Sequence, residues 1–280
     1  MNEATTAKKI PSNGIQEDEY LDESSGLLYC KKCQTPRQSQ TEVNGEIRYP
    51  RALCRCREEK RNRQAEERKA EAIRDRISRF RSIGLTDPVM REYTFTNDLG
   101  YNPRQMEMAK IYVENWEYML RDSAGIYFWG DVGTGKTFIA GCIANALLDR
   151  GVPVMMTNFT RLLNKLTDMY SGDRNAYIDS LNQFQLLIID DLGIERNTEF
   201  SREQVFNIVD SRYRSQLPMI FTTNLTPEIM RDHPELSQRR IFDRVVERCA
   251  AIRVNEQNIR RVNGDANMAK MRSLFREVRT

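Results

Sequence analysis

The chain has 280 residues, of which 40% are hydrophobic and 30% are charged, and its net charge is +3. No apolar run approaches the roughly 20 residues that span a bilayer, and residues 1–20 lack the apolar stretch of a signal peptide, so we expect a cytoplasmic protein without a membrane partner. The small net charge argues neither for nor against a nucleic-acid partner, because the distribution of charge matters more.

The N-terminal part divides into a polar tail, expected to be mobile over residues 1–26, and a cysteine-rich module over residues 27–56. Four thiols follow the pattern C-x2-C, twenty residues, C-x-C, and two close pairs separated by a loop can close a tetrahedral Zn²⁺ site. The only histidine, His233, is distant, so the site would be all-cysteine. A redox dithiol is the alternative. The expected zinc ligands are Cys30, Cys33, Cys54 and Cys56.

Residues 57–85 follow as a charged segment that predicts a linker helix. The stretch 57–80 is rich in Glu, Arg, Lys and Ala and contains neither Gly nor Pro, and Gly84 and Pro88 then end the pattern. Over residues 57–83, ten Arg or Lys stand against six Asp or Glu. We interpret this as a solvated connecting helix, with direct contact to DNA as the minority interpretation.

Residues 86–280 have the alternating pattern of an α/β domain. Residues 104–120 predict an amphipathic helix, and another helix should run from the glycine-rich stretch near residue 135 to Gly151. Apolar strands are expected at 125–130, 152–158, 184–193 and 217–225. Strands that alternate with helices predict a parallel sheet covered on both faces.

The stretch GDVGTGKT at residues 130–137 fits G-x-x-x-x-G-K-[ST], and it lies between an expected strand and an expected helix. Its glycines let backbone N–H groups face phosphates at the helix N-terminus. Lys136 would reach the β- and γ-phosphates, and the Thr137 hydroxyl would ligate Mg²⁺. The expected nucleotide-contacting residues are Gly130, Asp131, Val132, Gly133, Thr134, Gly135, Lys136, Thr137 and Phe138.

Three later segments carry further candidates. LLIIDD at 186–191 predicts a central strand that ends in Asp190, expected to hold Mg²⁺, and Asp191, expected to orient or activate the attacking water. Asn224 lies at the tip of the strand FTTNL, and it either hydrogen-bonds the γ-phosphate or the attacking water, or caps the next helix before Pro227. The arginine-rich segment 237–249 forms surface salt bridges or presents an arginine to the ATP of a neighbouring subunit.

These elements, in this order, resemble the AAA+ ATPases over residues 86–261. They are most similar to bacterial and phage helicase loaders of the DnaC/DnaI type, with the transposition helper IstB as a relative. The resemblance makes residues 130–137 Walker A and 190–191 Walker B, and it makes Asn224 sensor 1. It also makes Arg244 the trans-acting finger, with Arg240 as the alternative. Sensor 2 falls on Arg260, with Arg261 still possible.

The resemblance also implies activity and partners. It implies Mg²⁺-dependent ATP hydrolysis, self-association into a ring or spiral, and docking of the cysteine module onto the hexameric replicative helicase. Single-stranded DNA is expected at the insertion 159–182, through Arg161, Lys165, Tyr170, Arg174 and Tyr177. An ordinary helix and loop is the alternative there.

The competing functions are an IstB-like ATPase that assists a transposase and a non-enzymatic DNA-binding adaptor. We expect a basic helix over residues 262–280, and the sequence does not indicate its role.

Overall fold

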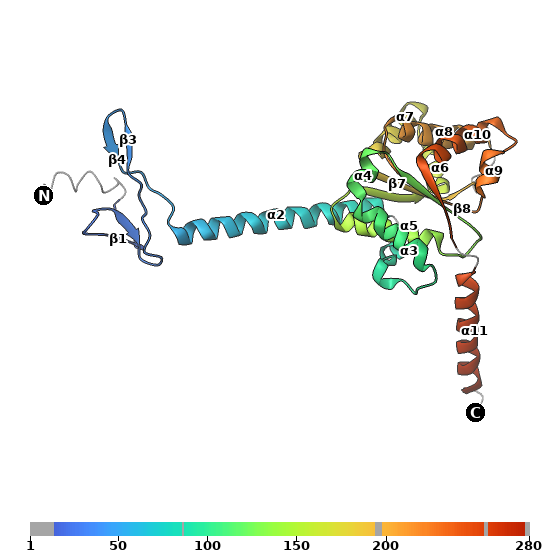
Figure 1. Ribbon diagram of the computed structural model, residues 1–280, viewed down its shortest axis with the longest axis horizontal. Helices are drawn as coiled ribbons and strands as arrows, with labels where there is room; N and C mark the ends of the chain where they lie inside the picture. Colours follow the sequence, from blue (N-terminus) through green and yellow to red (C-terminus); the bar gives the residue numbers. More distant parts are fainter. Residues whose placement is uncertain (1–13, 86, 194–197, 255–256, 278–280) are drawn as a thin grey trace. The chain divides into compact units, whose positions relative to one another are not determined.

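A computed structural model of the protein describes residues 14–85, 87–193, 198–254 and 257–277. The chain forms two compact units, Met1–Arg74 and Asp75–Thr280, which are described separately below (Figure 1). Glu195, a lesser candidate for the catalytic base, lies outside the described residues, as do residues 1–13 of the expected tail. Among the described residues, no helix has both the length and the apolar character needed to cross a membrane.

The first unit contains two small antiparallel hairpins. Strand β1 (Glu19–Leu21) pairs with β2 (Leu28–Cys30), and β3 (Thr41–Val43) pairs with β4 (Glu46–Arg48). The second hairpin turns at Asn-Gly, where both residues have positive φ, as a tight two-residue turn requires.

An ion-pair network holds the start of this unit. Glu19 is only 2% exposed, and its Oε1 lies 2.6 Å from a guanidinium nitrogen of Arg51 and 3.7 Å from Nε of Arg37. Arg37 also pairs with Asp18. The expectation of a mobile tail up to residue 26 was therefore wrong for residues 18–21, because contacts with residues 28–51 order them.

Helix α2 (Arg55–Gly84) confirms the charged helix predicted from residue 57 onward. Gly84 is its only buried residue. A Cβ atom at this glycine would lie 2.0 Å from the carbonyl oxygen of Val154, so the helix can end here only with glycine. The next residue, Leu85, forms a parallel bridge to Met156. This close approach fixes the last turn of α2 against the domain that follows.

The second unit is built on a five-stranded parallel sheet in the order β6-β7-β8-β5-β9. The five strands are β5 (Gly125–Trp129), β6 (Val154–Asn158), β7 (Leu186–Leu192), β8 (Met219–Thr223) and β9 (Cys249–Arg253). Four of them were predicted. The fifth, β9, was missed: Cys249, the last residue of the arginine-rich segment 237–249, is the buried first residue of this edge strand.

Helices cover both faces of the sheet, as predicted (Figure 1). The helix expected over 104–120 is divided at Asn115, which ends one helix and begins the next. The helical elements of this unit after α2 are η1 (Pro88–Glu92), η2 (Phe95–Asn97), α3 (Pro103–Glu114), α4 (Trp116–Arg121), α5 (Lys136–Asp149), α6 (Phe159–Thr167), α7 (Ser171–Ser180), η3 (Leu181–Gln183), α8 (Glu199–Arg214), α9 (Pro227–Arg231), α10 (Leu236–Arg248) and α11 (Ile259–Glu277).

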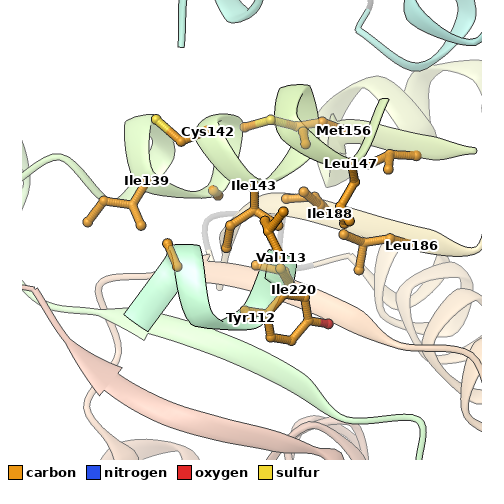
Figure 2. Packing of buried hydrophobic residues seen from close by; sticks show 14 of the residues in the cluster. Tyr112, Val113, Ile139, Cys142, Ile143, Leu147, Met156, Leu186, Ile188 and Ile220 are labelled. Atoms are coloured by element: carbon orange, nitrogen blue, oxygen red, sulfur yellow. The ribbon is translucent and has the colours of Figure 1, made fainter. Parts of the chain in front are cut away.

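Two apolar cores lie on opposite faces of the sheet, because successive strand residues point to opposite sides. On one face, α3 and α5 pack on the strands, and Figure 2 shows Ile143 of α5 close to Ile188 and Ile220. On the other face, α6, α8 and α10 pack against residues such as Leu187 and Phe221. The sheet is thus buried on both sides, and its carboxyl edge is left to carry polar groups.

Arg212 of α8 is a buried cation that binds only carbonyl oxygens. It is 1% exposed and donates to the carbonyls of Phe184 and Gln185, each at 2.7 Å, and of Pro218 at 3.0 Å. Burial lowers its pKa to about 9. The three carbonyls lie just before β7 and β8, so one side chain ties the amino ends of two central strands together.

Replacing Arg212 with Met, which keeps the length but removes the donors, should lower the free energy of unfolding by about 3 kcal/mol or more, since each orphaned buried acceptor costs about 1–3 kcal/mol. Urea denaturation followed by tryptophan fluorescence measures this. Arg214→Met on the same helix is the control, because its side chain is 76% exposed in its pair with Asp210 and such pairs contribute about 1 kcal/mol at most. Equal losses in both variants would contradict the assignment.

Candidate nucleotide-binding site

The glycine-rich loop joins β5 to α5, the context in which such a loop binds phosphate. Gly130, Gly133 and Gly135 have φ of +141°, +80° and +99°, which side chains with a Cβ rarely adopt. Gly135 immediately precedes α5, so the unpaired N–H groups of the first helical turn face the loop. The backbone therefore has the shape and the polarity needed to hold an anion.

A cavity of about 400 Å³ opens beside this loop, within the range of small-molecule sites. Its lining contains the predicted residues Val132, Gly133, Thr134, Gly135, Lys136, Thr137, Phe138, Asp191, Asn224 and Arg260. It also contains residues without a predicted site role, which come from the segment between η1 and α3, from α3 itself, from the first turn of α5 and from the start of α11: Tyr93, Asn97, Asp98, Leu99, Tyr101, Asn102, Met106, Ile139 and Ile259. Four of these residues belong to the stretch YTFTNDL at 93–99, and the sequence gives no sign that this stretch lines the pocket.

Lys136 is 6% exposed, and all three of its ammonium hydrogens are donated. The acceptors are the carbonyls of Gly130 and Asp131 at 2.8 and 2.7 Å and the amide oxygen of Asn224 at 2.8 Å. Burial lowers the pKa of this amine, while the nearby carboxylates, Asp191 first, oppose that shift. The structure thus brings Asn224, from the end of β8, directly onto the lysine of the loop.

Asp190 is a buried residue of β7 and faces the hydroxyl of Thr137, which donates to Oδ1 of Asp190 at 2.9 Å. Thr222 of β8 donates to the same oxygen. Burial raises the pKa of Asp190, and these hydroxyl donors counteract the rise. A carboxylate and a hydroxyl held together beside a phosphate-binding loop are hard oxygen donors of the kind that Mg²⁺ prefers, so the residues present fit this ion.

Asp191 has φ of +61°, although it is not glycine. The pairing of β7 with β8 shifts register between Ile189 and Leu192, and the amide of Asp191 donates instead to the hydroxyl of Thr222 at 2.9 Å. This bulge places Asp191 in the wall of the cavity, next to Asp190. Uncommon backbone conformations concentrate at functional sites, which supports a role for Asp191 in the chemistry.

The junction before α11 packs onto the loop. The amide of Ile259 donates to the carbonyl of Gly133 at 2.8 Å, and a Cβ on Gly133 would lie 2.5 Å from Oδ1 of Asn258. Arg260 lines the cavity, whereas Arg261 is not among the lining residues and its amide bonds to the side chain of Asn258. The geometry therefore favours Arg260 over Arg261 for the predicted sensor 2 role.

Gly133→Ala should weaken ATP binding by about tenfold or more, because a Cβ at positive φ costs about 1–2 kcal/mol and here also collides with Asn258. Isothermal titration calorimetry measures this affinity. Gly151→Ala is the matched control: its φ is +77°, and nothing lies within 4 Å of its added Cβ. That variant should lose stability but keep its affinity. Similar affinity losses in both would argue against a contact specific to the loop.

Arg244 faces α8 of its own chain. Its guanidinium lies 2.6 Å from Oδ1 of Asp210 and stacks on the rings of Phe206 and Tyr213, with centroid distances of 4.7 and 5.6 Å. Arg240, one turn earlier on α10, is exposed. Neither arginine lines the nucleotide cavity of its own chain. An action on another copy remains a prediction for Arg244, and the contacts with α8 give it a packing role as well.

The four N-terminal cysteines converge. Their sulfur atoms all lie within 4.8 Å of one another, with Cys30 to Cys56 at 3.7 Å and Cys54 to Cys56 at 3.4 Å. A tetrahedral site with Zn–S bonds of about 2.3 Å needs sulfurs about 3.8 Å apart, so the arrangement fits a Cys₄ zinc site. The hydroxyl of Thr35 helps to lower the pKa of Cys33 to about 5, and Cys54 helps to raise that of Cys56 to about 12.

The segment expected to bind single-stranded DNA uses several of its side chains internally. Nζ of Lys165 lies 4.3 Å from the ring centroid of Tyr177. Arg174 stacks on Phe200 and donates to the carbonyl of Leu166 at 2.9 Å. Tyr170, in contrast, is 84% exposed at the start of α7. Of the expected set, Tyr170 offers the freest ring for stacking on a base.

Comparison with known proteins places this geometry in context. The chain is 25% identical over 267 residues to the replicative helicase loader DnaI of Bacillus subtilis, covering 86% of this chain and 81% of that protein. It is 28% identical over 143 residues to the replicative helicase loader DnaC of Escherichia coli K12, covering 50% of this chain and 56% of DnaC.

Solved structures show the same fold. A crystal structure of DnaI matches with a TM-score of 0.50 and 22% identity, covering 60% of this chain and 94% of that one. AMPPCP-bound DnaA from Aquifex aeolicus matches with a TM-score of 0.50 and 21% identity, covering 66% of this chain and 55% of that one. The predicted α/β fold, an AAA+ core with a parallel sheet, is confirmed. The sequence profile of the IstB-like ATP binding proteins matches residues 36–266, and the chain belongs to this family.

Proposed function

We propose that this protein is an ATPase that loads a hexameric replicative helicase onto single-stranded DNA. The observation that carries the proposal is a phosphate-binding loop, two Walker-type carboxylates and a Cys₄ cluster in one chain whose alignment with the loader DnaI covers 86% of its length. That share is more than residues 57–280 alone can supply, so the alignment reaches into the cysteine module.

In this proposal the parts of the chain have separate tasks. Residues 27–56, held by zinc, dock onto the helicase, and residues 57–85 connect them to the ATPase domain at 86–280. The exposed ring of Tyr170 takes part in binding single-stranded DNA. Copies of the chain associate so that one copy completes the nucleotide site of the next.

The residues of the site suit hydrolysis of the terminal phosphate. Mg²⁺, held by Thr137 and Asp190, would neutralise charge on the β- and γ-phosphates. The ammonium group of Lys136 would give up its hydrogen bonds to the loop carbonyls and to Asn224 and would donate to phosphate oxygens instead. Asp191 would orient a water molecule and accept its proton as the water oxygen bonds to the γ-phosphorus and the bond to the bridging oxygen breaks. ADP and phosphate leave, and Asn224, Arg260 and an arginine of a second copy stabilise the developing charge.

The test has two arms. In the first, the chain is mixed with the replicative helicase of its host, with ATP and Zn²⁺ present, and the complex is detected by size-exclusion chromatography with light scattering. In the second, helicase transfer onto circular single-stranded DNA is scored. Lys136→Ala should still form the complex but should fail in transfer. The double variant Cys30→Ser/Cys33→Ser should fail in both, while Glu46→Ser on the module surface should behave as the wild type.

Two outcomes would contradict the proposal. If the wild type forms no helicase complex yet still hydrolyses ATP, the transposase-assisting ATPase takes its place, and assembly on duplex rather than single-stranded DNA would then be expected. If the wild type hydrolyses no ATP, or if Asp190→Ala does not abolish the hydrolysis that is found, the non-enzymatic adaptor is favoured.

A further inference from the structure

Strand β9 leaves one edge of the parallel sheet open. At the opposite edge, β6 is covered where Leu85 bridges to Met156. β9 is the last strand of the sheet, and no element of the described chain pairs with its outer side. Open strand edges are usually covered, bent or charged, because they pair readily with other chains. Ala250 and Ala251 of β9 are small and exposed, so they do not shield this edge.

The hydrogen bonds of this segment show which backbone groups lie on the outer side. In a parallel ladder a residue directs its N–H and C=O to the same neighbour, and successive residues alternate between the two sides. The amide of Val254, just after β9, donates to the carbonyl of Trp129 in β5 at 2.8 Å. By alternation, Ala251 and Arg253 direct their backbone groups away from β5. The carbonyl of Arg253 accepts from the side chain of Gln105 at 2.8 Å, which agrees with this direction. The N–H and C=O of Ala251 are thus directed to where a further strand would lie.

A groove of about 520 Å³ lies between the outer edge of β9 and helix α3. Its lining includes Arg104, Gln105 and Met108 of α3 and Ala251, Ile252 and Arg253 of β9. Met108 is 37% exposed, so the groove offers apolar surface beside its polar groups. A strand added to β9 would place the side chains of one of its faces in this groove, because successive strand residues point to opposite sides.

The cations of the groove lie on both faces of the sheet. Arg104, on the side of α3, is exposed and forms no ion pair within the described ranges of the chain. Ile252 packs into the core on the α3 side, so the next residue, Arg253, points to the opposite face. There its guanidinium lies 5.4 Å from the ring centroid of Trp129. An added strand would meet one arginine on each face.

No carboxylate is among the residues that line the groove in the described chain. Two acids lie close to the lining residues in sequence, and both have partners. On α3, Glu107 lies 3.9 Å from Nζ of Lys110. At the end of α10, Glu247 lies 3.8 Å from Arg248 and accepts from the hydroxyl of Tyr213 at 2.9 Å. The groove therefore favours an occupant with negative charge.

We propose that this groove binds an extended acidic segment of a partner protein, which adds to β9 as a further strand of the sheet. The main chain of the segment exchanges hydrogen bonds with Ala251, and its carboxylates pair with Arg104 and Arg253. A nucleic-acid strand could supply phosphates to the arginines, but it lacks alternating N–H and C=O groups, so the open edge favours a peptide. The groove belongs to the ATPase domain, and the proposal does not depend on docking of residues 27–56 onto a helicase.

Fluorescence anisotropy of the full chain with a labelled peptide tests the role of charge. The probe is Thr-Val-Asp-Asp-Thr-Val-Asp-Asp, which carries acids on both faces when extended. It should bind saturably, whereas the same peptide with Lys in place of Asp should not. Arg104→Glu should weaken binding about tenfold or more, because repulsion replaces a charge-assisted hydrogen bond. Lys110→Glu is the matched control: it makes the same charge change on α3 outside the lining, and it should bind as the wild type.

Ala251→Pro tests the addition of a strand. Proline removes only the outward N–H, and an edge strand tolerates it where that N–H bonds to no neighbouring strand. Peptide binding should fall about tenfold or more, because a hydrogen bond is lost and the proline ring occupies the edge. Ala251→Val keeps the N–H and should bind as the wild type. Circular dichroism and ATP affinity should be unchanged in both variants, which shows that the domain is folded.

Amide hydrogen exchange of the wild type, followed by NMR, locates the contact. The acidic peptide should slow exchange at Ala251, whose amide it covers. The amide of Ala250, which is directed toward β5, should change much less. This difference between two adjacent residues would not arise if the peptide bound through its charges alone.

Several outcomes would overturn the proposal. The acidic peptide could fail to bind, the basic peptide could bind equally well, or Ala251→Pro could bind as the wild type. If oligo-dT binds in a manner that depends on Arg104 and the acidic peptide does not compete with it, the groove belongs to nucleic acid. Absence of a helicase complex together with intact peptide binding would contradict the loader function alone.

Discussion

Cys30→Ser/Cys33→Ser is expected to unfold the N-terminal module while the ATPase domain stays folded. Between residues 14 and 54, the buried apolar side chains are only Leu28 and the metal-site cysteines Cys30 and Cys54, too little for a core. Structural zinc supplies an apparent binding free energy of about 10–16 kcal/mol to such peptides. Hydrogen exchange should show lost amide protection in β1 and β2, and elemental analysis should find one zinc per wild-type chain and none in the variant.

Tryptophan fluorescence reports on the second unit alone in this experiment. Both tryptophans of the chain, Trp116 and Trp129, lie in the ATPase domain, so their fluorescence should not change in the cysteine variant or after chelation. ATP affinity should also be unchanged. Glu46→Ser serves as the control, because Glu46 lies in an exposed pair with Arg48 and should keep both zinc and protection. Full amide protection in a zinc-free module would disprove the structural role of the metal.

Arg244→Ala should leave ATP binding nearly intact and lower hydrolysis by about 10³-fold or more, the scale found for arginine fingers. The physical reason is that a guanidinium from a second copy would meet charge that develops only in the transition state. Steady-state hydrolysis should rise with protein concentration in the wild type, because in the proposed arrangement the complete site would need two copies. Titration calorimetry and phosphate release measure the two quantities separately.

The contacts of Arg244 within its own chain require a control for packing. Asp210→Asn removes the carboxylate partner of Arg244 without removing the guanidinium, so it should lower stability more than hydrolysis. Arg240→Ala tests the alternative finger. Mixing Arg244→Ala with Lys136→Ala should restore part of the activity, since one protein keeps an intact loop and the other an intact arginine. Loss of nucleotide binding in Arg244→Ala, or no recovery on mixing, would show that Arg244 serves its own chain.

Local chemistry explains what the sequence could predict. The glycine-rich loop, Asp190 and Asn224 were recognisable because each follows an apolar strand, and the carboxyl ends of parallel strands share one edge of the sheet. The Cys₄ cluster was predictable because the spacing of its cysteines along the sequence is itself typical of a zinc site. Each of these depends on residues close together in the chain.

The missed features depend on distant contacts. Ala250 and Ala251 of β9 carry no strong strand preference, and pairing along β5 makes this segment a strand. The bulge at Asp191 follows from its register against β8, which the sequence of β7 alone does not contain. Glu19 is ordered by arginines 18 and 32 residues later in the chain, and a polar segment seen by itself gives no warning of that.

The hydrogen bond between Lys136 and Asn224 has a consequence for how the site discriminates between nucleotides. Every donor of the ammonium group is already satisfied, so an incoming phosphate gains only the difference between its own bonds and those that it displaces. A phosphate oxygen would replace these oxygens as an acceptor of the ammonium group, and we expect that a β-phosphate can replace the loop carbonyls whereas replacing Asn224 needs a γ-phosphate. In that case only a triphosphate would release the amide of Asn224, and the end of β8 would report the presence of the third phosphate.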